Sequence, residues 1–270
     1  MLLSIEASAL NRAGKTSDGL DVLWGVIEAE HLRPAVGIQV IYDLARTLAD
    51  DTNRFQRQRL FQLVVDLDPA FLVPAEHLLD YELMKLQRGD AIVPCLMADS
   101  RRTTMDILIR LARGESDAEA VRFTKSREAE IDSARRQDRK HVRQLEEATE
   151  RGDIPQLASF EEFCEYLRPQ LPRVIQRRYQ GRIDAQDASR LADRLEEFRA
   201  LRTTVMADLH FMFFRVKGRH LPSREKTADY RPISEAAYCT AVLIDDARLL
   251  GKVGLLNPDL RAIPYPRVAA

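Results

Sequence analysis

Segments that look like β-strands lie only near the two ends of this 270-residue chain, and this distribution limits the fold most strongly. Apolar runs of strand length occur at residues 2–5 and 71–74 near the start, and at residues 242–244 and 262–266 near the end. In the middle of the chain, apolar side chains recur at helical spacing instead. We therefore expect one α/β core, made of residues 1–88 and 225–270, with an all-helical insertion of residues 89–224.

The apolar pattern also predicts where the helices lie. Ser159, followed three residues later by Glu162, matches the pattern of a capping box at a helix start. Residues 117–151 are dense in charges of both signs, which is typical of a solvated helix or a hairpin arm. The expected helices are residues 20–30, 36–49, 55–65, 75–86, 92–111, 160–166, 172–179, 187–201, 204–214 and 233–241, with a short helix or turn at 249–256.

The composition is that of a balanced, folded protein. The chain has 41 Lys and Arg against 42 Asp and Glu, a formal net charge of -1 and 45% hydrophobic residues. These values argue against wholesale disorder and against a strongly basic nucleic-acid binder, although local patches matter more than the sum. The cysteines, Cys95, Cys164 and Cys239, suit neither a disulfide framework nor a zinc site, so a reducing cytoplasm is the simplest location. We expect no targeting segment and no membrane span, because no apolar run reaches about 18 residues.

Acidic side chains directly follow a predicted strand at each end of the chain. Asp245 and Asp246 come after residues 242–244, and Glu6 comes after residues 2–5. Ligands of open α/β sheets bind at the carboxyl ends of strands, and Mg²⁺ and Mn²⁺ prefer oxygen donors. The sequence therefore indicates a metal site, but the more ordinary use of Asp245 and Asp246 is to cap the helical turn that follows them.

Three segments together are similar to the motifs of PIN-domain nucleases. Residues 4–12, SIEASALNR, resemble the family's opening strand, which an Asp, a Thr and a Ser or Asn follow. Residues 39–46, QVIYDLAR, look like the second motif, in which a helix carries an acidic residue followed by Leu. Residues 238–250, which contain VLIDDAR, are similar to the strand that ends in Thr-Asp-Asp-Arg or Thr-Arg-Asp. The resemblance covers roughly residues 1–88 and 229–267.

The resemblance implies a PIN-like three-layer fold with a short, mostly parallel sheet and four acidic positions that converge at one edge. The third position is an Asp at a helix start; Asp229, 17 residues before Asp246, matches the family's offset, and Glu235 is the alternative. Carboxylates this close repel one another, so the site requires one or two Mg²⁺ or Mn²⁺ ions. The implied catalytic residues are Glu6, Asp43, Asp229, Asp245 and Asp246, and the implied metal ligands are Glu6, Asp43, Asp229 and Asp245.

The chain departs from the family pattern at three positions. Glu6 replaces the usual Asp and is one methylene longer, whereas Asp43 replaces the usual Glu and is one methylene shorter. Ala7 stands where the family has a Thr whose hydroxyl could orient a carboxylate. Two interpretations stay open, because the two length changes either compensate for one another or mark a site that has lost its activity.

Arginines close to the proposed acids in sequence are candidates for binding the phosphates of a substrate, and the alternative for each is an ordinary surface ion pair. They are Arg12, Arg46 and Arg248. The five histidines lack the spacing of a zinc enzyme, and we expect His210, set among aromatic residues, to be a half-buried structural side chain.

These observations predict a cytoplasmic, Mg²⁺- or Mn²⁺-dependent endoribonuclease that hydrolyses phosphodiester bonds of RNA at a cluster of carboxylates. In this hypothesis, the helical insertion shapes access of the RNA or binds a protein partner. One alternative is a catalytically degenerate PIN-like protein with a binding or regulatory role. Another is a helical interaction adaptor that is unrelated to nucleases.

Overall fold

The computed structural model describes residues 1–45, 54–115, 158–179, 182–218 and 230–266, together with scattered positions between 116 and 157. Within these ranges, five strands form one sheet in the order β3-β2-β1-β4-β5, and every neighbouring pair is parallel. The strands are β1 (Leu2–Ile5), β2 (Arg33–Gly37), β3 (Ala70–Leu72), β4 (Ala241–Ile244) and β5 (Arg261–Pro264). The expected α/β fold, with strands contributed by both ends of the chain, is confirmed.

The strand β1 lies at the centre of the sheet. Its residue Ser4 pairs with Ala35 of β2 on one side and with Val242 of β4 on the other. The chain first builds outward from β1 through β2 to β3, and later returns to the other side of β1 to add β4 and β5. The order of the strands therefore changes direction between β1 and β4. In open α/β sheets, the carboxyl ends of the strands at such a switch point form the usual ligand-binding crevice.

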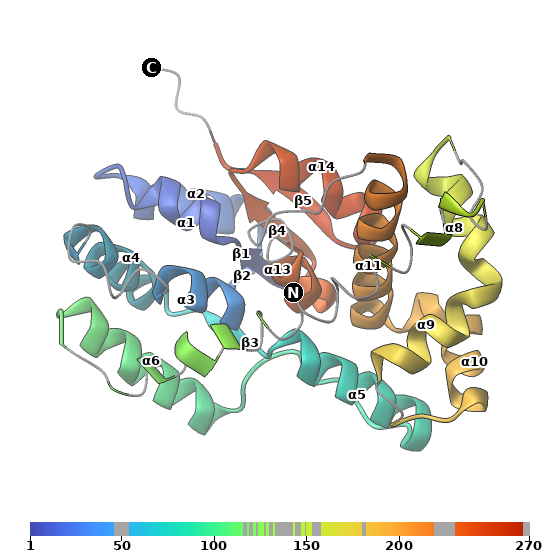
Figure 1. The fold of residues 1–270 in the computed structure, drawn as a ribbon. Coiled ribbons are helices and arrows are strands. Elements are labelled where there is room, and N and C mark those ends of the chain that lie inside the picture. Colours follow the sequence, from blue (N-terminus) through green and yellow to red (C-terminus); the bar gives the residue numbers. More distant parts are fainter. Residues whose placement is uncertain are drawn as a thin grey trace.

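Helices cover both faces of the sheet, which gives three layers (Figure 1). Ala241 and Leu243 of β4 share one hydrophobic cluster with Leu3 and Ile5 of β1, whereas Val242 and Ile244 belong to another, because successive side chains of a strand point to opposite faces. The helices of the first cluster are α1 (Ala7–Ala13), α2 (Gly19–Glu30), α3 (Ile38–Ala45), α4 (Arg54–Leu67) and α6 (Ala98–Ala112). Those of the second are α13 (Arg231–Glu235), the 3₁₀-helix η4 (Ala236–Tyr238), α14 (Ala247–Leu256) and part of α11 (Arg199–Gly218).

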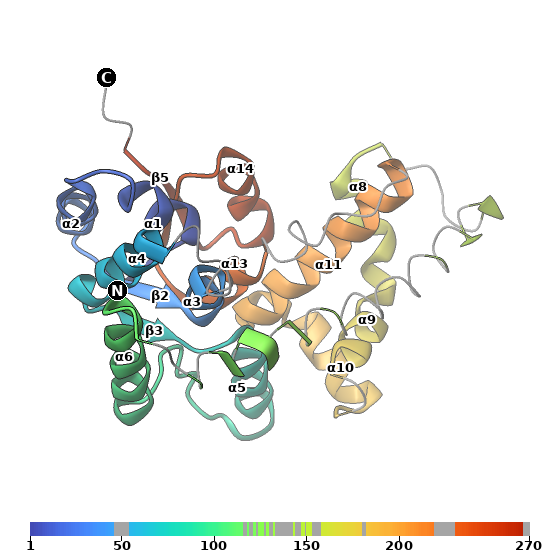
Figure 2. The same cartoon turned by 60° about the vertical axis from the view of Figure 1, so that its left-hand side comes forward.

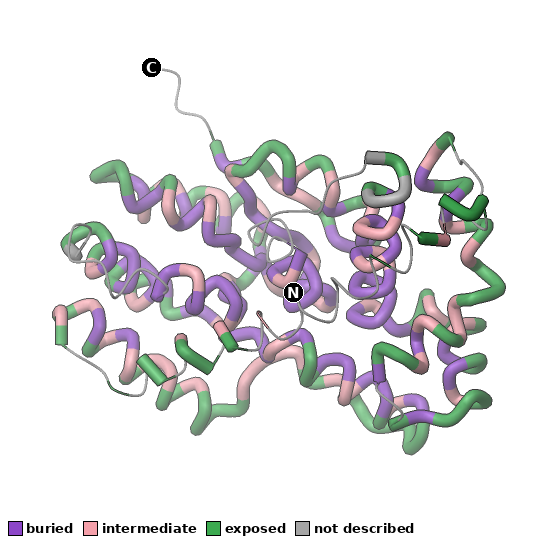
Figure 3. The backbone as a smooth tube through the Cα atoms, viewed as in Figure 1, coloured by how far each residue is buried: buried purple, intermediate pink, exposed green. Residues whose placement is uncertain are grey.

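A further hydrophobic cluster holds a group of helices beside the sheet, and Figure 2 shows this group projecting from the α/β body. Its helices are α5 (Ala75–Arg88), α8 (Phe160–Leu167), α9 (Leu171–Arg178), α10 (Ala185–Asp193) and α11. Figure 3 shows that β1, β4 and much of α11 are buried, whereas many residues of α9 and α10 are exposed or half-buried. The helix α11 therefore lies between the sheet and the outer helices.

The expected division into a core and an insertion of residues 89–224 stays a prediction, and the hydrophobic clusters run across its boundaries. The helix α6 contributes Leu108 and Leu111 to the cluster of the sheet. The helix α5, in contrast, contributes Leu78 and Leu83 to the helical cluster. Most of residues 117–151 lies outside the described residues. In the described part of the chain, no helix has both the length and the apolar character that a membrane span needs.

The strand β2 is the main element that the sequence pattern does not predict. The segment 36–49 is expected to be helical, but Val36 and Gly37 belong to β2, and α3 begins only at Ile38. Pro34 looks like a break in the chain, yet it lies inside β2 opposite Leu3. Pairing of β2 with β3 begins one residue later, at Ala35, so the missing N–H of Pro34 costs that ladder no hydrogen bond.

Other helix boundaries differ by local breaks. Residues 93–96 run along β3 rather than starting α6, and the Leu96 N–H donates to the Phe71 carbonyl at 2.8 Å. The segment 187–201 is interrupted by the 3₁₀-helix η3 (Leu195–Glu197), which separates α10 from α11. Ser159 caps α8 as expected, because its hydroxyl accepts the Glu162 N–H at 3.2 Å, and the Glu162 carboxylate accepts the N–H of Ala158, the residue before the cap, at 2.9 Å.

Candidate functional site

A serine joins the carboxyl ends of β1 and β4 at the switch point. The Ser8 N–H donates to Oε2 of Glu6 at 2.7 Å, and the Ser8 hydroxyl donates to the same oxygen. The Ser8 hydroxyl also accepts the backbone N–H groups of Asp245 at 3.0 Å and of Asp246 at 3.2 Å. Ser8 therefore holds the loop after β4 against the first turn of α1, and with it the predicted acids of both motifs.

Glu6 is a buried carboxylate, with 8% of its surface exposed. Burial raises the pKa of Glu6 above its ordinary value, because desolvation disfavours the charged form. The hydrogen bonds from Ser8 and Ala7 oppose this shift, and the negative charge of Asp246 adds to it. The carboxylates of Glu6 and Asp246 are thus close enough to repel one another, with burial as the larger effect.

Asp246 also caps a helix, so the alternative interpretation of this residue is confirmed. Its Oδ1 accepts the N–H groups of Arg248 at 2.7 Å and of Leu249 at 3.3 Å, in the first turn of α14. Asp246 is exposed and Asp245 is half-buried. The Asp246 carboxylate therefore lies at the N-terminus of α14, directly after β4.

Asp43 lies on α3, the helix that follows β2, and is half-buried. Its Oδ1 accepts a hydrogen bond from Nε2 of Gln39, one turn earlier on the same helix, at 3.1 Å. Gln39 is fully buried. Because β2 is the neighbour of β1, α3 begins at the same edge of the sheet that carries Glu6.

Glu235, the alternative for the third acidic position, is fully buried at the end of α13. Both of its oxygens lie within hydrogen-bond distance of the Gln39 N–H, at 3.2 and 2.9 Å, in the first turn of α3. Gly37 makes room for it, because a Cβ at this position would overlap with Oε2 of Glu235. Asp229 itself lies outside the described residues.

The structure describes two of the three candidate arginines. Arg12, in the last turn of α1, and Arg248, in the first turn of α14, are both exposed. Arg12 and Asp245 both act electrostatically on the buried Tyr265, which directly follows β5, while burial is the main cause that raises the pKa of Tyr265. Arg12 thus lies near the carboxyl edge of the sheet. Arg46 lies outside the described residues.

The donors at this edge are carboxylate oxygens, the type of ligand that Mg²⁺ and Mn²⁺ take. Among the described residues, however, no group of three or more His, Cys, Asp or Glu side chains is arranged to hold a metal ion. The donors therefore match such an ion in type, although the described residues alone do not form a complete site for it. A cavity of about 410 Å³ lies elsewhere, with Thr16, Arg59 and Asp66 in its wall and none of the proposed acids.

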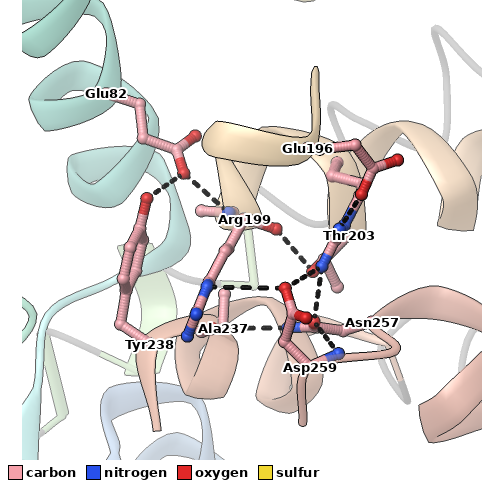
Figure 4. A network of polar contacts seen from close by, with 10 residues as sticks. Glu82, Glu196, Arg199, Thr203, Ala237, Tyr238, Asn257 and Asp259 are labelled. Carbon is pink, nitrogen blue, oxygen red and sulfur yellow. Dashed lines mark hydrogen bonds and ion pairs between the residues drawn. The ribbon is translucent and has the colours of Figure 1, made fainter. Parts of the chain in front are cut away.

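A second polar centre, which the sequence pattern does not predict, lies where the helical group meets the sheet (Figure 4). Glu82 of α5 is fully buried and accepts the N–H groups of Ala200 and Leu201, each at 2.7 Å, in the first turn of α11. The Tyr238 hydroxyl donates to it at 2.6 Å. Burial raises the pKa of Glu82 to about 7.

The same centre contains a buried guanidinium. Arg202 of α11 donates to Asn257 at 3.1 Å and to Asp259 at 2.5 Å, and it pairs with Glu196. Asn257, in turn, donates to the Ala237 carbonyl at 3.3 Å. These contacts fasten α11 to η4 and to the turn after α14.

His210 is a structural side chain, and it is buried rather than half-buried. Its Nδ1 lies 3.0 Å from the Tyr230 hydroxyl, and its ring packs edge-on against Phe160 and Phe214. Burial lowers the pKa of His210 to about 4, so the ring is neutral at physiological pH.

Comparison with known proteins adds no family to this geometry. No family model matches the chain, and no significant match is found among curated proteins or among solved structures.

Proposed function

We propose that this protein is a PIN-like endoribonuclease that depends on Mg²⁺ or Mn²⁺. The observation that carries the proposal is the set of hydrogen bonds made by the Ser8 hydroxyl. These bonds hold Glu6 and the loop of Asp245 and Asp246 together at the switch point of a parallel sheet. The strand order and the position of Asp43 on α3 support it. The proposed acids are Glu6, Asp43, Asp229 and one or both of Asp245 and Asp246.

Burial and, to a smaller extent, the neighbouring Asp246 disfavour the charged form of Glu6, as its raised pKa indicates. A cation at this edge would relieve the repulsion between Glu6 and Asp246. When bound, a divalent ion would lower the pKa of a water molecule and stabilise the oxygen that leaves phosphorus. Arg12 and Arg248, exposed beside this edge, are proposed to contact phosphates of the RNA, with Arg46 in the same role.

Cleavage assays with isosteric variants test the proposal. Glu6→Gln and Asp246→Asn remove a charge but keep an acceptor oxygen, so both helix caps stay in place. We expect wild-type protein to cleave single-stranded or structured RNA with Mg²⁺ or Mn²⁺, and each variant to lose at least about 100-fold in rate. Asp99→Asn, which changes an exposed acid in the first turn of α6, is the matched control and should cleave as wild type does. Wild-type protein that does not cleave RNA, or full activity in the Glu6 and Asp246 variants, would refute the nuclease.

A catalytically degenerate PIN-like protein with a binding or regulatory role is the second candidate. It is favoured by the capping roles of Glu6 and Asp246 and by the lack of a three-ligand group among the described residues. A Mn²⁺ titration separates the two proposals. A nuclease binds Mn²⁺ in a manner that Glu6→Gln weakens, whereas a degenerate site binds none.

The role of the expected helical insertion, residues 89–224, stays a prediction. In the proposed nuclease, it shapes access of the RNA to the carboxylates or binds a protein partner.

A further inference from the structure

The helix that carries Asp43 is fastened by a buried contact of long sequence separation to the helix that follows Asp229 in the sequence. Glu235 on α13 and Gln39 on α3 are 196 residues apart, and the Glu235 carboxylate accepts the Gln39 N–H through both oxygens. Asp229 precedes Glu235 by six residues, and Asp43 follows Gln39 by four. The contact therefore joins the element that follows one proposed acid to the helix that carries another.

The backbone around this contact is adapted to it. Gly37, the last residue of β2, leaves space for the Glu235 carboxylate, and a Cβ there would overlap with it. The carboxylate can thus approach the first turn of α3 closely, where N–H groups have no partner within the helix. A negative charge at this end is also stabilised by the helix dipole.

Gln39 continues the connection to Asp43. Its backbone N–H donates to Glu235, while its side-chain Nε2 donates to Oδ1 of Asp43 at 3.1 Å. Gln39 and Glu235 are both fully buried, so water does not compete for these hydrogen bonds. One residue thus makes contacts that fix both the start of α3 and the orientation of the Asp43 carboxylate.

We propose that Glu235 is a positioning residue of the carboxylate edge. It fixes α3 against α13, and Gln39 transmits this constraint to the carboxylate of Asp43. This inference rests on the proposed function for its effect on metal binding, and it assigns Glu235 a role distinct from that of a metal ligand.

Glu82 supplies a matched control for the test. It is also a fully buried Glu whose carboxylate accepts backbone N–H groups in the first turn of a helix, but that helix is α11 and carries none of the proposed acids. The experiment measures two quantities in Glu235→Gln, Gln39→Ala and Glu82→Gln: hydrogen exchange of the residue-39 amide by NMR, and the Kd for Mn²⁺ by calorimetry.

Glu235→Gln keeps one of the two oxygens beside the Gln39 N–H but replaces the other with an amide group that cannot accept it, so this contact is weaker. We therefore expect the variant to speed exchange of the Gln39 amide by about tenfold and to raise the Kd for Mn²⁺ by about tenfold. Gln39→Ala keeps the backbone donor, so exchange at residue 39 should stay as in wild type while the Kd for Mn²⁺ rises several-fold. Glu82→Gln should change neither quantity. Gln39→Ala and Glu235→Gln replace a side chain without removing the backbone cap donor, so both test the proposal in folded protein.

Several results would overturn the proposal. Wild-type affinity for Mn²⁺ in both Glu235→Gln and Gln39→Ala would show that neither residue positions Asp43. Complete loss of Mn²⁺ binding in Glu235→Gln, with unchanged exchange at Gln39, would make Glu235 a ligand instead. If wild-type protein binds no Mn²⁺, the proposed function fails, and exchange alone decides the anchoring of α3: unchanged exchange in Glu235→Gln refutes it, and faster exchange supports it.

Discussion

Glu235 and Glu82 occupy similar local environments in two different regions of the molecule. Each is fully buried and accepts backbone N–H hydrogen bonds from the first turn of a helix far away in the sequence: Glu235 from Gln39, and Glu82 from Ala200 and Leu201. They differ in what lies beyond the cap. Glu82 faces the Tyr238 hydroxyl and the charge of Lys85, whereas Glu235 is connected through Gln39 to the carboxylate of Asp43.

This difference distinguishes Glu82, which holds helices together, from Glu235, which is connected to the candidate site. At Glu82, the hydrogen-bond donors of α11 and of Tyr238 contact one carboxylate, and these bonds hold α5, α11 and η4 together. At the sheet edge, the network leads on to further acids, and Ser8 ties Glu6 to the loop of Asp245 and Asp246. A buried carboxylate that caps a helix therefore does not by itself indicate a functional site. The residues to which its hydrogen-bond network connects distinguish the two cases.

Removal of the Glu82 carboxylate should have the largest effect on stability. Glu82→Ala leaves the N–H groups of Ala200 and Leu201 and the Tyr238 hydroxyl without this acceptor, at about 1–3 kcal/mol for each group. We expect the free energy of unfolding in urea to fall by about 3 kcal/mol or more. Glu82→Gln keeps an acceptor oxygen and should lose much less. Equal stability of the Ala variant and wild type would contradict the view of Glu82 as a structural joint.

The second prediction concerns pH. The pKa of Glu82 is raised from 4.5 to about 7, so the folded state keeps a proton that the unfolded chain releases. This contribution to stability is complete below about pH 4.5 and is lost as pH rises through about 7, with a size of up to about 3 kcal/mol. The difference in unfolding free energy between wild type and Glu82→Gln, measured from about pH 5 to about pH 8, should follow this decline. A difference independent of pH would show that Glu82 keeps an ordinary pKa.

Gly37→Ala tests the other buried glutamate. The new Cβ would overlap with the Glu235 carboxylate and displace it from α3, so we expect a loss of about 1–3 kcal/mol in unfolding free energy. Gly25→Ala in α2 is the control, because a Cβ there meets no atom within 4 Å, and it should stabilise the protein by up to about 1 kcal/mol. The measurement is the unfolding free energy of both variants in urea. Equal unfolding free energies would mean that displacing the Glu235 carboxylate costs no stability.

The smallest expected effect is that of Ser8→Ala. The change removes the acceptor of the Asp245 and Asp246 N–H groups and a donor to Glu6, at about 1–2 kcal/mol, because water reaches part of this edge. Mn²⁺ affinity should fall together with stability. Ser189→Ala, which removes an exposed hydroxyl that donates to the Ala185 carbonyl, should change neither quantity. Unchanged Mn²⁺ affinity in Ser8→Ala would show that the hydrogen bonds of Ser8 do not contribute to the candidate site.

The sequence predicts the parts of the fold that depend on local patterns. The apolar runs that become β1 and β4 and the cap of α8 by Ser159 are visible in a few consecutive residues. The strand β2 is missed because Pro34 breaks the local pattern, and only its register beside β1 and β3 explains why it is tolerated.

Of the candidate site, only the acidic residues can be predicted from the sequence. Glu6 and Asp246 follow strands, so their shared edge can be inferred, but the bridge through Ser8 requires the distance between β1 and β4. Glu82 and Glu235 could not be assigned to caps, because their partners lie 118 and 196 residues away. A signal for Ser8 exists in its position two residues after Glu6, where a hydroxyl can reach back to the carboxylate.

The most direct test of the central claim is anomalous X-ray scattering from crystals of this protein soaked in Mn²⁺. The account predicts a manganese peak at the carboxyl ends of β1 and β4, within coordination distance of Glu6 and Asp245 or Asp246, and no such peak in Glu6→Gln. A fully occupied peak elsewhere, or no peak beside Glu6, would contradict it.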